Sequence, residues 1–173
     1  RGIRLHVKVL TAPTRFSIET MLASMREVYV RAGLRVLLGS TESLNLPNLL
    51  DLETGKCASG FGDNITGEVA DLYSNRRFVQ GDDLVIYFIR DTTPDSLNGC
   101  AHHPSGRPGA VVTAQASTWT LGHEVGHVLG LDHVDDNNRL MTEHGTDKIT
   151  NPPPDLNAFE ILDLVSDDLA FDL

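Results

Sequence analysis

Apolar and polar residues alternate between positions 3 and 9, with isoleucine, leucine and valine at the odd positions and arginine, histidine and lysine at the even ones. A period of two residues is typical of a β-strand with one covered face. Residues 17–32 then carry apolar side chains at helical spacing, Gly33 follows as a stop, and residues 34–38 resume a strand pattern. The pattern predicts strand, helix, strand, with the two strands parallel.

The middle of the chain has weaker patterning. Residues 39–64 are rich in glycine, serine, asparagine, proline and aspartate, which indicates a long surface excursion. A helix is predicted over residues 66–78. The nearly continuous apolar run at 83–90 indicates a central strand that is covered on both faces. Residues 91–109 read as a loop, and the short β-branched run at 110–114 reads as a further strand.

The last third of the chain predicts two more helices. The first begins near Ser117 or Thr118, either of which can cap exposed backbone amides. The second covers residues 155–170, after a rigid proline-rich spacer at 151–154. Its expected packing residues are Leu156, Phe159, Leu162, Val165 and Leu169. Because no repeat, low-complexity tract or linker interrupts the chain, we expect one domain over residues 1–173.

Composition and charge narrow the classes of protein. The chain has 173 residues, 40% of them hydrophobic, which is enough for a proper core. No segment approaches the length of a membrane span, so no membrane insertion is expected. The formal net charge of −10 argues against nucleic acid or an anionic membrane as a partner. We expect a monomer.

Two cysteines, Cys57 and Cys100, lie in the loop-rich part of the chain. An even number suits one disulfide in an oxidising compartment, and two reduced buried thiols are the alternative. The disulfide is the preferred interpretation. We therefore expect a secreted or extracellular protein, with a signal and pro-segment outside the given sequence.

The strongest chemical signal is the sequence HEVGHVLGLDH, which begins at His123. His123 and His127 lie one helical turn apart, so both rings can reach one ion, and Glu124 borders that face. In a continued helix, His133 would lie about 15 Å further along the axis than His123. The helix must therefore stop, and Gly130 can adopt the left-handed conformation that turns the chain back.

Three histidines leave one open position on a tetrahedral zinc ion, which is the catalytic pattern. A water molecule fills that position, and Glu124 is placed to act as its general base and then as an acid. This predicts a zinc-dependent endopeptidase that acts on protein or peptide substrates. The alternatives are histidines without a metal, a non-catalytic zinc domain that acts as a binding module, and an exopeptidase that removes terminal residues.

The chain resembles the metzincin clan of zinc endopeptidases, whose signature is this long motif followed by a methionine in a tight turn. Met141 matches that methionine, and the sequence of the motif is most similar to those of matrix metalloproteinases and compact bacterial relatives. The resemblance implies an α/β (α+β) domain with a twisted, mostly parallel sheet, an antiparallel edge strand, an active-site helix and a C-terminal helix. It also implies that Met141 forms a hydrophobic floor beneath the metal and is not a ligand.

The resemblance further implies which residues contact the substrate. The strand at 110–114 is expected to be the cleft edge to which an extended peptide adds, and an ordinary strand without a ligand is the alternative. The residues after Met141 are expected to shape the pocket for the side chain that follows the cleaved bond, with a hydrophobic preference. These substrate-binding candidates are Val111, Val112, Thr113, Thr142, Glu143 and His144.

Calcium sites are also implied by the resemblance. Six oxygen-rich positions are the candidates, namely Asp82, Asp83, Asp135, Asp136, Asn137 and Asn138. No complete calcium loop motif is present among them, so solvated turns are the preferred interpretation and Ca²⁺ stays a secondary expectation beside Zn²⁺.

Overall fold

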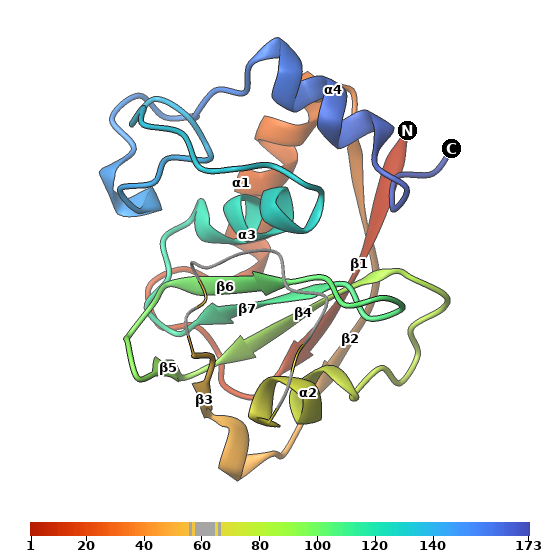
Figure 1. Cartoon of the computed structure of the whole chain (residues 1–173), viewed down its shortest axis with the longest axis vertical. Coiled ribbons are helices and arrows are strands. Elements are labelled where there is room, and N and C mark those ends of the chain that lie inside the picture. Colours follow the sequence, from red (N-terminus) through yellow and green to blue (C-terminus); the bar gives the residue numbers. More distant parts are fainter. Residues whose placement is uncertain (56, 58–64, 66) are drawn as a thin grey trace.

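A five-stranded sheet runs in the order β2 (Arg35–Ser43), β1 (Gly2–Val9), β4 (Leu84–Ile89), β7 (Gly109–Thr113) and β6 (Gly99–His102) (Figure 1). The strands β2, β1, β4 and β7 are parallel to one another, and β6 is antiparallel to β7. The computed structural model describes residues 1–55, 57, 65 and 67–173. The expected mostly parallel sheet with one antiparallel edge strand is confirmed.

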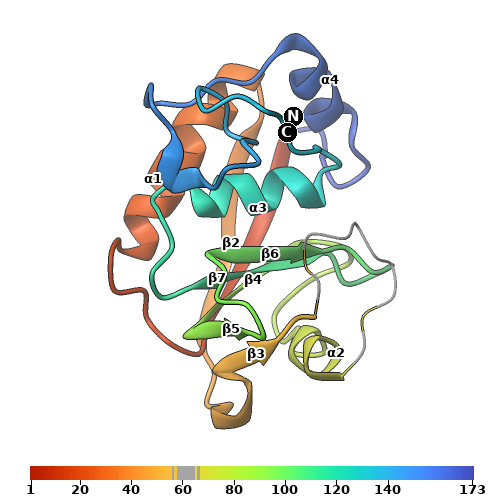
Figure 2. The same ribbon diagram turned by 60° about the vertical axis from the view of Figure 1, so that its left-hand side comes forward.

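The helices divide between the two faces of the sheet (Figure 2). One face packs against α1 (Ile18–Tyr29), α3 (Thr120–Val128) and α4 (Ala158–Ser166). The other face packs against α2 (Gly67–Tyr73) and a small parallel pair, β3 (Asp51–Glu53) with β5 (Asp91–Thr93). Short 3₁₀ turns are η1 (Val30–Ala32), η2 (Pro47–Leu49) and η4 (Thr146–Lys148). No described helix is both long and apolar enough to cross a bilayer.

The opening of the chain folds as its periodicity predicts. The Ser17 hydroxyl accepts a hydrogen bond from the Thr20 amide at 3.1 Å and so caps α1. The apolar stripe of α1 is buried at Met21, Leu22, Met25, Val28 and Tyr29. Gly33 adopts a left-handed conformation with φ of 74°, which ends η1 and leads the chain into β2.

The central strand β4 has six buried side chains, as the continuous apolar run predicts. Leu84, Ile86 and Phe88 belong to the core under α1 and α3. Val85, Tyr87 and Ile89 belong to the core under α2. Because successive side chains of a strand point to opposite faces, β4 joins the two halves of the hydrophobic core.

The prediction that β1 has only one covered face is wrong. His6 and Lys8 are 4% and 0% exposed, because the segment that contains Arg77 covers the second face of the strand. The buried ammonium of Lys8 donates to Glu42 Oε2 and to the Arg77 carbonyl, each at 2.5 Å. These partners offset the desolvation of the charge, so a polar residue occupies a buried strand position.

Several boundaries in the middle of the chain also differ from the predictions. The excursion expected at 39–64 contains the second half of β2 and the short strand β3, while residues 56, 58–64 and 66 lie outside the described part. The helix expected over 66–78 ends at Tyr73. The loop expected at 91–109 contains β5 and β6.

The strand expected to form the cleft edge is internal. β7 pairs with β4 on one side and with β6 on the other, and Val111, Val112 and Thr113 are fully buried. Since both backbone edges of β7 are occupied, these residues cannot accept an added peptide strand. Among the strands that the structure describes, β6 lies at the edge on this side of the sheet.

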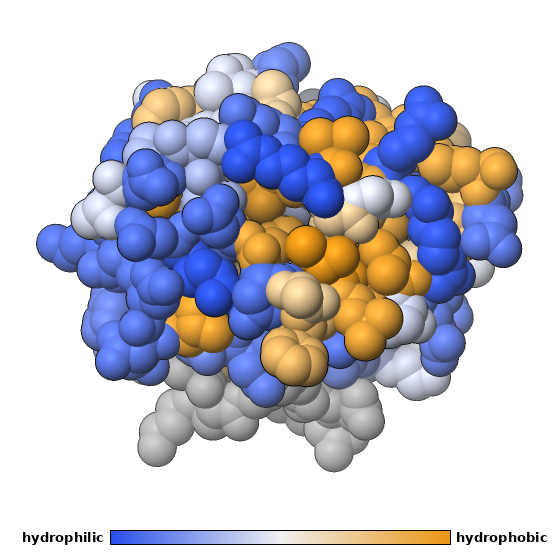
Figure 3. All heavy atoms as spheres, turned by 90° about the horizontal axis from the view of Figure 1, so that it is seen from above, coloured by the Kyte–Doolittle hydropathy of each residue, from blue (hydrophilic) through white to orange (hydrophobic). Residues whose placement is uncertain are grey.

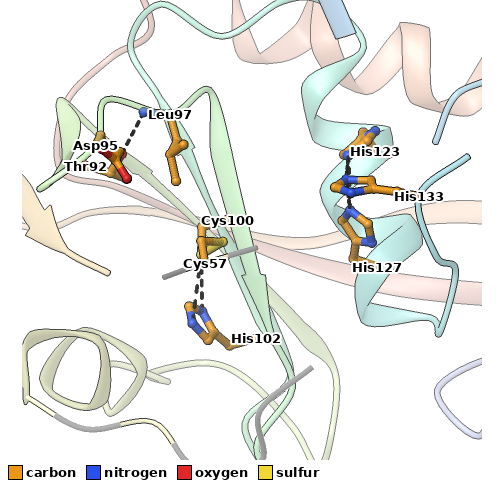
Figure 4. Close-up of a disulfide and its surroundings, with 9 residues drawn as sticks. All are labelled: Cys57, Thr92, Asp95, Leu97, Cys100, His102, His123, His127 and His133. Atoms are coloured by element: carbon orange, nitrogen blue, oxygen red, sulfur yellow. Dashed lines mark hydrogen bonds between the residues drawn. A yellow bond between two sulfur atoms is a disulfide. The ribbon is translucent and has the colours of Figure 1, made fainter. Parts of the chain in front are cut away.

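Cys57 and Cys100 form a disulfide that attaches residue 57 to β6 (Figure 4).

The last helix, α4, begins with a capping box between Asn157 and Glu160. Phe159 and Leu162 of α4 were expected to pack in the core, but they are 79% and 60% exposed. Figure 3 shows the apolar side chains gathered on this upper face of the molecule.

Candidate metal centre

The helix α3 begins at Thr120, two to three residues after the predicted start. The N-cap is Trp119, which makes no side-chain capping hydrogen bond, so the predicted cap at Ser117 or Thr118 is wrong. Hydroxyl groups instead stabilise the turn before the helix: Ser117 Oγ accepts from the Trp119 amide, and the Ser117 amide donates to Thr120 Oγ1. Leu121 and Val125 of α3 are fully buried in the core between the sheet and the helices α1, α3 and α4. This packing fixes α3 across the β6 side of the sheet (Figures 1 and 2).

The helix ends in a Schellman motif at Gly130. The Gly130 amide donates to the His127 carbonyl at 3.0 Å, and the Leu131 amide donates to the Gly126 carbonyl at 2.9 Å. Gly130 has φ of 88°, the left-handed region that the turn requires. The chain then reverses, and His133 Nε2 comes to 3.2 Å from His123 Nε2 and 3.0 Å from His127 Nε2.

Replacing Gly130 with alanine is expected to lower the free energy of unfolding by about 1 kcal/mol. A Cβ there would meet no atom within 4 Å, so the cost comes from the left-handed backbone alone. Denaturant unfolding of the metal-free protein measures the change. Gly130→Asn is the matched control and should cost less, because asparagine tolerates this conformation better; equal stability of all three proteins would contradict the prediction.

Backbone carbonyls orient two of the three imidazoles. His123 Nδ1 lies 2.7 Å from the Leu140 carbonyl oxygen, and His127 Nδ1 lies 2.8 Å from the Leu131 carbonyl oxygen. A carbonyl only accepts hydrogen bonds, so the proton of each neutral ring is on Nδ1. The lone pair of each Nε2 then points at the centre of the triad, as a metal ligand requires.

The spacing of the three rings fits a metal ion (Figure 4). His123 Nε2 and His127 Nε2 are 3.1 Å apart, similar to their distances from His133. Bonds of about 2.0–2.1 Å to a tetrahedral zinc ion would place the ligand nitrogens about 3.3–3.4 Å apart. Burial lowers the pKa of His123 to about 3 and that of His127 to about 4, so both rings are neutral at physiological pH. Three facing lone pairs repel one another, and a shared cation removes that repulsion.

Glu124 lies beside the triad and is 7% exposed. Its burial raises the pKa of the carboxyl group to about 8. The side chain packs against Gly99 of β6, where a Cβ would lie 2.7 Å from Glu124 Cγ. Gly99 is therefore part of the site, and the sequence analysis missed it. In the sequence, Gly99 was only a glycine within the segment 91–109, which was predicted to be a loop, so nothing nearby indicated a role in the site.

A cavity of about 620 Å³ lies in front of the triad and contains Glu124 in its wall. One wall comes from the β6 edge, and the other comes from the segment that follows Met141. The lining residues are Cys57, Ser96, Leu97, Asn98, Gly99, Ala101, Thr120, His123, Glu124, His127, Asp132, His133, Glu143, Gly145 and Thr146. The outer edge of β6, which pairs with no other described strand, and the candidate metal centre thus open into the same cavity.

The three candidates that follow Met141 have different positions. Glu143 lines the cavity. Thr142 is fully buried, and its hydroxyl donates to Asn137 Oδ1 at 2.8 Å, so it supports the loop and does not face a substrate. His144 does not line the cavity, and its Nε2 lies 2.6 Å from Asp135 Oδ1. This orienting partner of His144 was not evident from the sequence.

Met141 is fully buried beneath the helix turn that carries His127. A Cβ on Gly126 would lie 2.6 Å from Met141 Sδ, so the thioether packs directly on the backbone of α3. The amide of Val134, next to His133, also donates to the Met141 carbonyl at 2.9 Å. Met141 thus contacts the helix and the returning loop that together carry the three histidines.

The oxygen-rich positions considered for calcium form local contacts. Asp83 contacts Arg4 and His6, and Asp136 Oδ1 accepts from the Asn138 amide. The side-chain oxygens of Asn137 and Asn138 accept from threonine hydroxyls. Asp136, Asn137 and Asn138 thus stabilise turns, whereas Asp83 is mostly buried and pairs with β1 instead of lying in a solvated turn. The described residues give no support for calcium.

Comparison with solved structures identifies proteins of the same fold. Metalloproteinase-II from Bacteroides fragilis superposes with a TM-score of 0.69 at 16% identity, over 99% of this chain and 54% of that one. This chain therefore spans about half of that structure. Archaemetzincin from Methanopyrus kandleri gives a TM-score of 0.60 at 18% identity, over 94% and 93% of the two chains.

The chain has a metzincin-like fold. A zinc-dependent peptidase from Methanocorpusculum labreanum is a further match, with a TM-score of 0.54 at 14% identity over 92% of this chain and 99% of that one. No protein-family model matches the sequence, and the search of curated proteins gives no match. The likeness of this metzincin-like chain to its neighbours is therefore one of fold, and its chemistry has to be argued from its own residues.

Proposed function

We propose that this protein is a zinc-dependent endopeptidase. The observation that carries the proposal is the convergence of three imidazole Nε2 atoms, 3.0–3.2 Å apart, beside a buried carboxyl group in an accessible cavity. His123, His127 and His133 would hold the metal. Nitrogen donors in a three-histidine set with an open fourth position favour zinc, and three structural neighbours are described as metalloproteinase, archaemetzincin or zinc-dependent peptidase.

A zinc ion bound there would act as a Lewis acid on the scissile carbonyl and would lower the pKa of a water molecule. A cation held by the three histidines would favour the ionised form of Glu124 over the buried carboxylic acid, and the carboxylate then accepts a proton as the water oxygen attacks the carbonyl carbon. It then delivers that proton to the amide nitrogen as the C–N bond breaks, so that an amine leaves and a carboxylic acid forms. Glu124 is mostly buried but lines the cavity, and the absence of a Cβ at Gly99 leaves room for its side chain beside β6.

The free edge of β6 supports binding of an extended peptide. A strand edge that pairs with no other described strand offers backbone amides and carbonyls to a substrate of any sequence, and Asn98, Gly99 and Ala101 at this edge line the cavity. A peptide added along β6 would continue past the metal centre in both directions. This arrangement favours cleavage within a chain over removal of terminal residues.

We also propose that the protein acts outside the cell. The disulfide between Cys57 and Cys100 supports this location, because disulfides persist in oxidising compartments. Cys57 lies in the cavity wall, so an oxidising environment would preserve the shape of the proposed site.

The test is digestion of peptides whose two ends are blocked by acetylation and amidation, with cleavage sites mapped by mass spectrometry. The zinc-loaded protein is expected to cut blocked peptides internally, to lose activity on treatment with a chelator and to recover it on addition of zinc. If the protein removed terminal residues one at a time from unblocked peptides and did not cut blocked peptides, it would be an exopeptidase. Zinc binding without any cleavage would indicate a binding module.

A further inference from the structure

The acidic side chains of this protein fall into two groups. Away from the cavity, most charged contacts join a carboxylate to a lysine or arginine, as in Asp51 with Arg90 at 2.6 Å and Glu42 with Lys8 at 2.5 Å. In the cavity wall, Glu143 and Asp132 form no ion pair with a lysine or arginine among the described residues. The contact of Glu143 with His144, at 4.0 Å, is long.

The backbone fixes Glu143 close to the metal centre. Its amide donates to the Val134 carbonyl at 2.9 Å, one residue beyond His133, and a parallel bridge joins Val134 to Thr142. Asp132 is the residue directly before His133 and also lines the cavity. Two carboxylates therefore flank the third histidine on the wall opposite the β6 edge.

The cavity also contains a buried acceptor. Glu124 is nine-tenths buried, lines the cavity and has no hydrogen-bond or ion-pair partner in the part of the chain that the structure describes. The lining residues that the structure describes include no lysine or arginine. A volume of about 620 Å³ is large enough for a long side chain beside the scissile bond. Among the described lining residues, the walls beside the proposed zinc site therefore carry carboxyl groups and no ammonium or guanidinium group.

From this arrangement we infer that the cleft selects peptides with a lysine or arginine next to the scissile bond, and that Glu143, assisted by Asp132, recognises the cationic group. The inference rests on the proposed peptidase function and names the substrate class of that site. It differs from the hydrophobic preference that the family resemblance implies. The Glu143 side chain is 49% exposed, so an apolar side chain beside it would remove part of its hydration without offering a partner, whereas a lysine or arginine would form an ion pair with it.

The experiment compares blocked, otherwise neutral peptides that carry lysine or norleucine at each position around the cut. Norleucine has the same straight carbon chain without the amino group. The zinc-loaded native protein is expected to prefer lysine at one position by about tenfold in kcat/KM. Glu143→Gln should bring the ratio of lysine to norleucine cleavage towards one, and Glu143→Lys should make glutamate the preferred residue at that position.

Asp168→Asn is the matched control, because it removes one negative charge from an exposed position outside the cavity lining, and it should leave the ratio unchanged. The inference would be overturned if the native protein showed no preference for lysine. It would also be overturned if the preference persisted in a Glu143→Gln and Asp132→Asn double variant. A loss of lysine preference in Asp168→Asn as large as that in Glu143→Gln would overturn it as well.

A binding measurement separates this inference from the peptidase proposal. Zinc-loaded Glu124→Gln protein is titrated with fluorescent lysine and norleucine peptides, and the lysine peptide is expected to bind about tenfold more tightly. That result would support the inference even if no peptide were cleaved by the native protein. Equal affinity for the two peptides, or no binding of either, would overturn it even if neutral peptides were cleaved.

Discussion

Replacing Glu124 with glutamine is expected to reduce kcat/KM for peptide cleavage by about 10²–10⁴-fold while zinc remains bound. Glutamine has nearly the same volume, so the packing against Gly99 is retained, but its amide cannot accept the proton of the attacking water. The ligands should be unaffected, because backbone carbonyls orient His123 and His127. Steady-state kinetics and metal analysis of the same preparation measure the two effects.

Glu19→Gln is the matched control, because it makes the same chemical change in the exposed first turn of α1. It should retain both zinc and full activity. If Glu124→Gln cleaved peptides at the native rate, Glu124 would not be the base. If the variant lost zinc together with activity, Glu124 would act in assembly of the metal centre, and the assignment of proton transfer to it would fail.

Local periodicity predicted those parts of the fold whose burial is set within one segment. The alternation at 3–9, the helical stripe at 17–32 and the apolar run at 83–90 each correspond to an element of the structure. The three histidines and Glu124 could be predicted for the same reason, since their spacing along one helix and its turn fixes their relation to a single ion. In each case a short stretch contains all the necessary information.

The predictions from sequence that were wrong concern contacts between segments that are distant along the chain. β6 is four residues long and reads Gly-Cys-Ala-His, so it has no clear alternation, and its strand conformation depends on pairing with β7. The polar residues of β1 were assigned to solvent, yet Lys8 is buried because Glu42 and the Arg77 carbonyl are brought to it by the fold. Periodicity carries no information on such partners.

The same limit applies to the walls of the candidate site. Gly99 and Glu124 are 25 positions apart in the sequence and touch only because β6 passes next to α3. The substrate strand was assigned to 110–114 from the family resemblance, but this strand is paired on both sides, and among the described strands β6 lies at the edge. Identifying the substrate wall therefore required the strand order.

Replacing Gly99 with alanine is expected to reduce kcat by about 10²-fold, because a displacement of the general base by about 1 Å has an effect of this size. The added Cβ would lie 2.7 Å from Glu124 Cγ and 2.9 Å from the Val111 carbonyl oxygen. The second contact is to the backbone, so rotation of the Glu124 side chain alone cannot relieve the overlap. Zinc content and the circular dichroism spectrum should stay those of the native protein.

Gly122→Ala provides the matched control, since it adds a methyl group to α3 with ordinary contacts, the nearest being Met25 Cγ at 3.5 Å. It should retain activity and gain about 0.5–1 kcal/mol of stability, because alanine has the higher helix propensity. A double-mutant cycle then tests the cause. If Gly99→Ala acts by moving Glu124, it should have little further effect in a Glu124→Gln background. An undiminished 10²-fold loss in that background would show that Gly99 acts on the substrate strand, and not through the base.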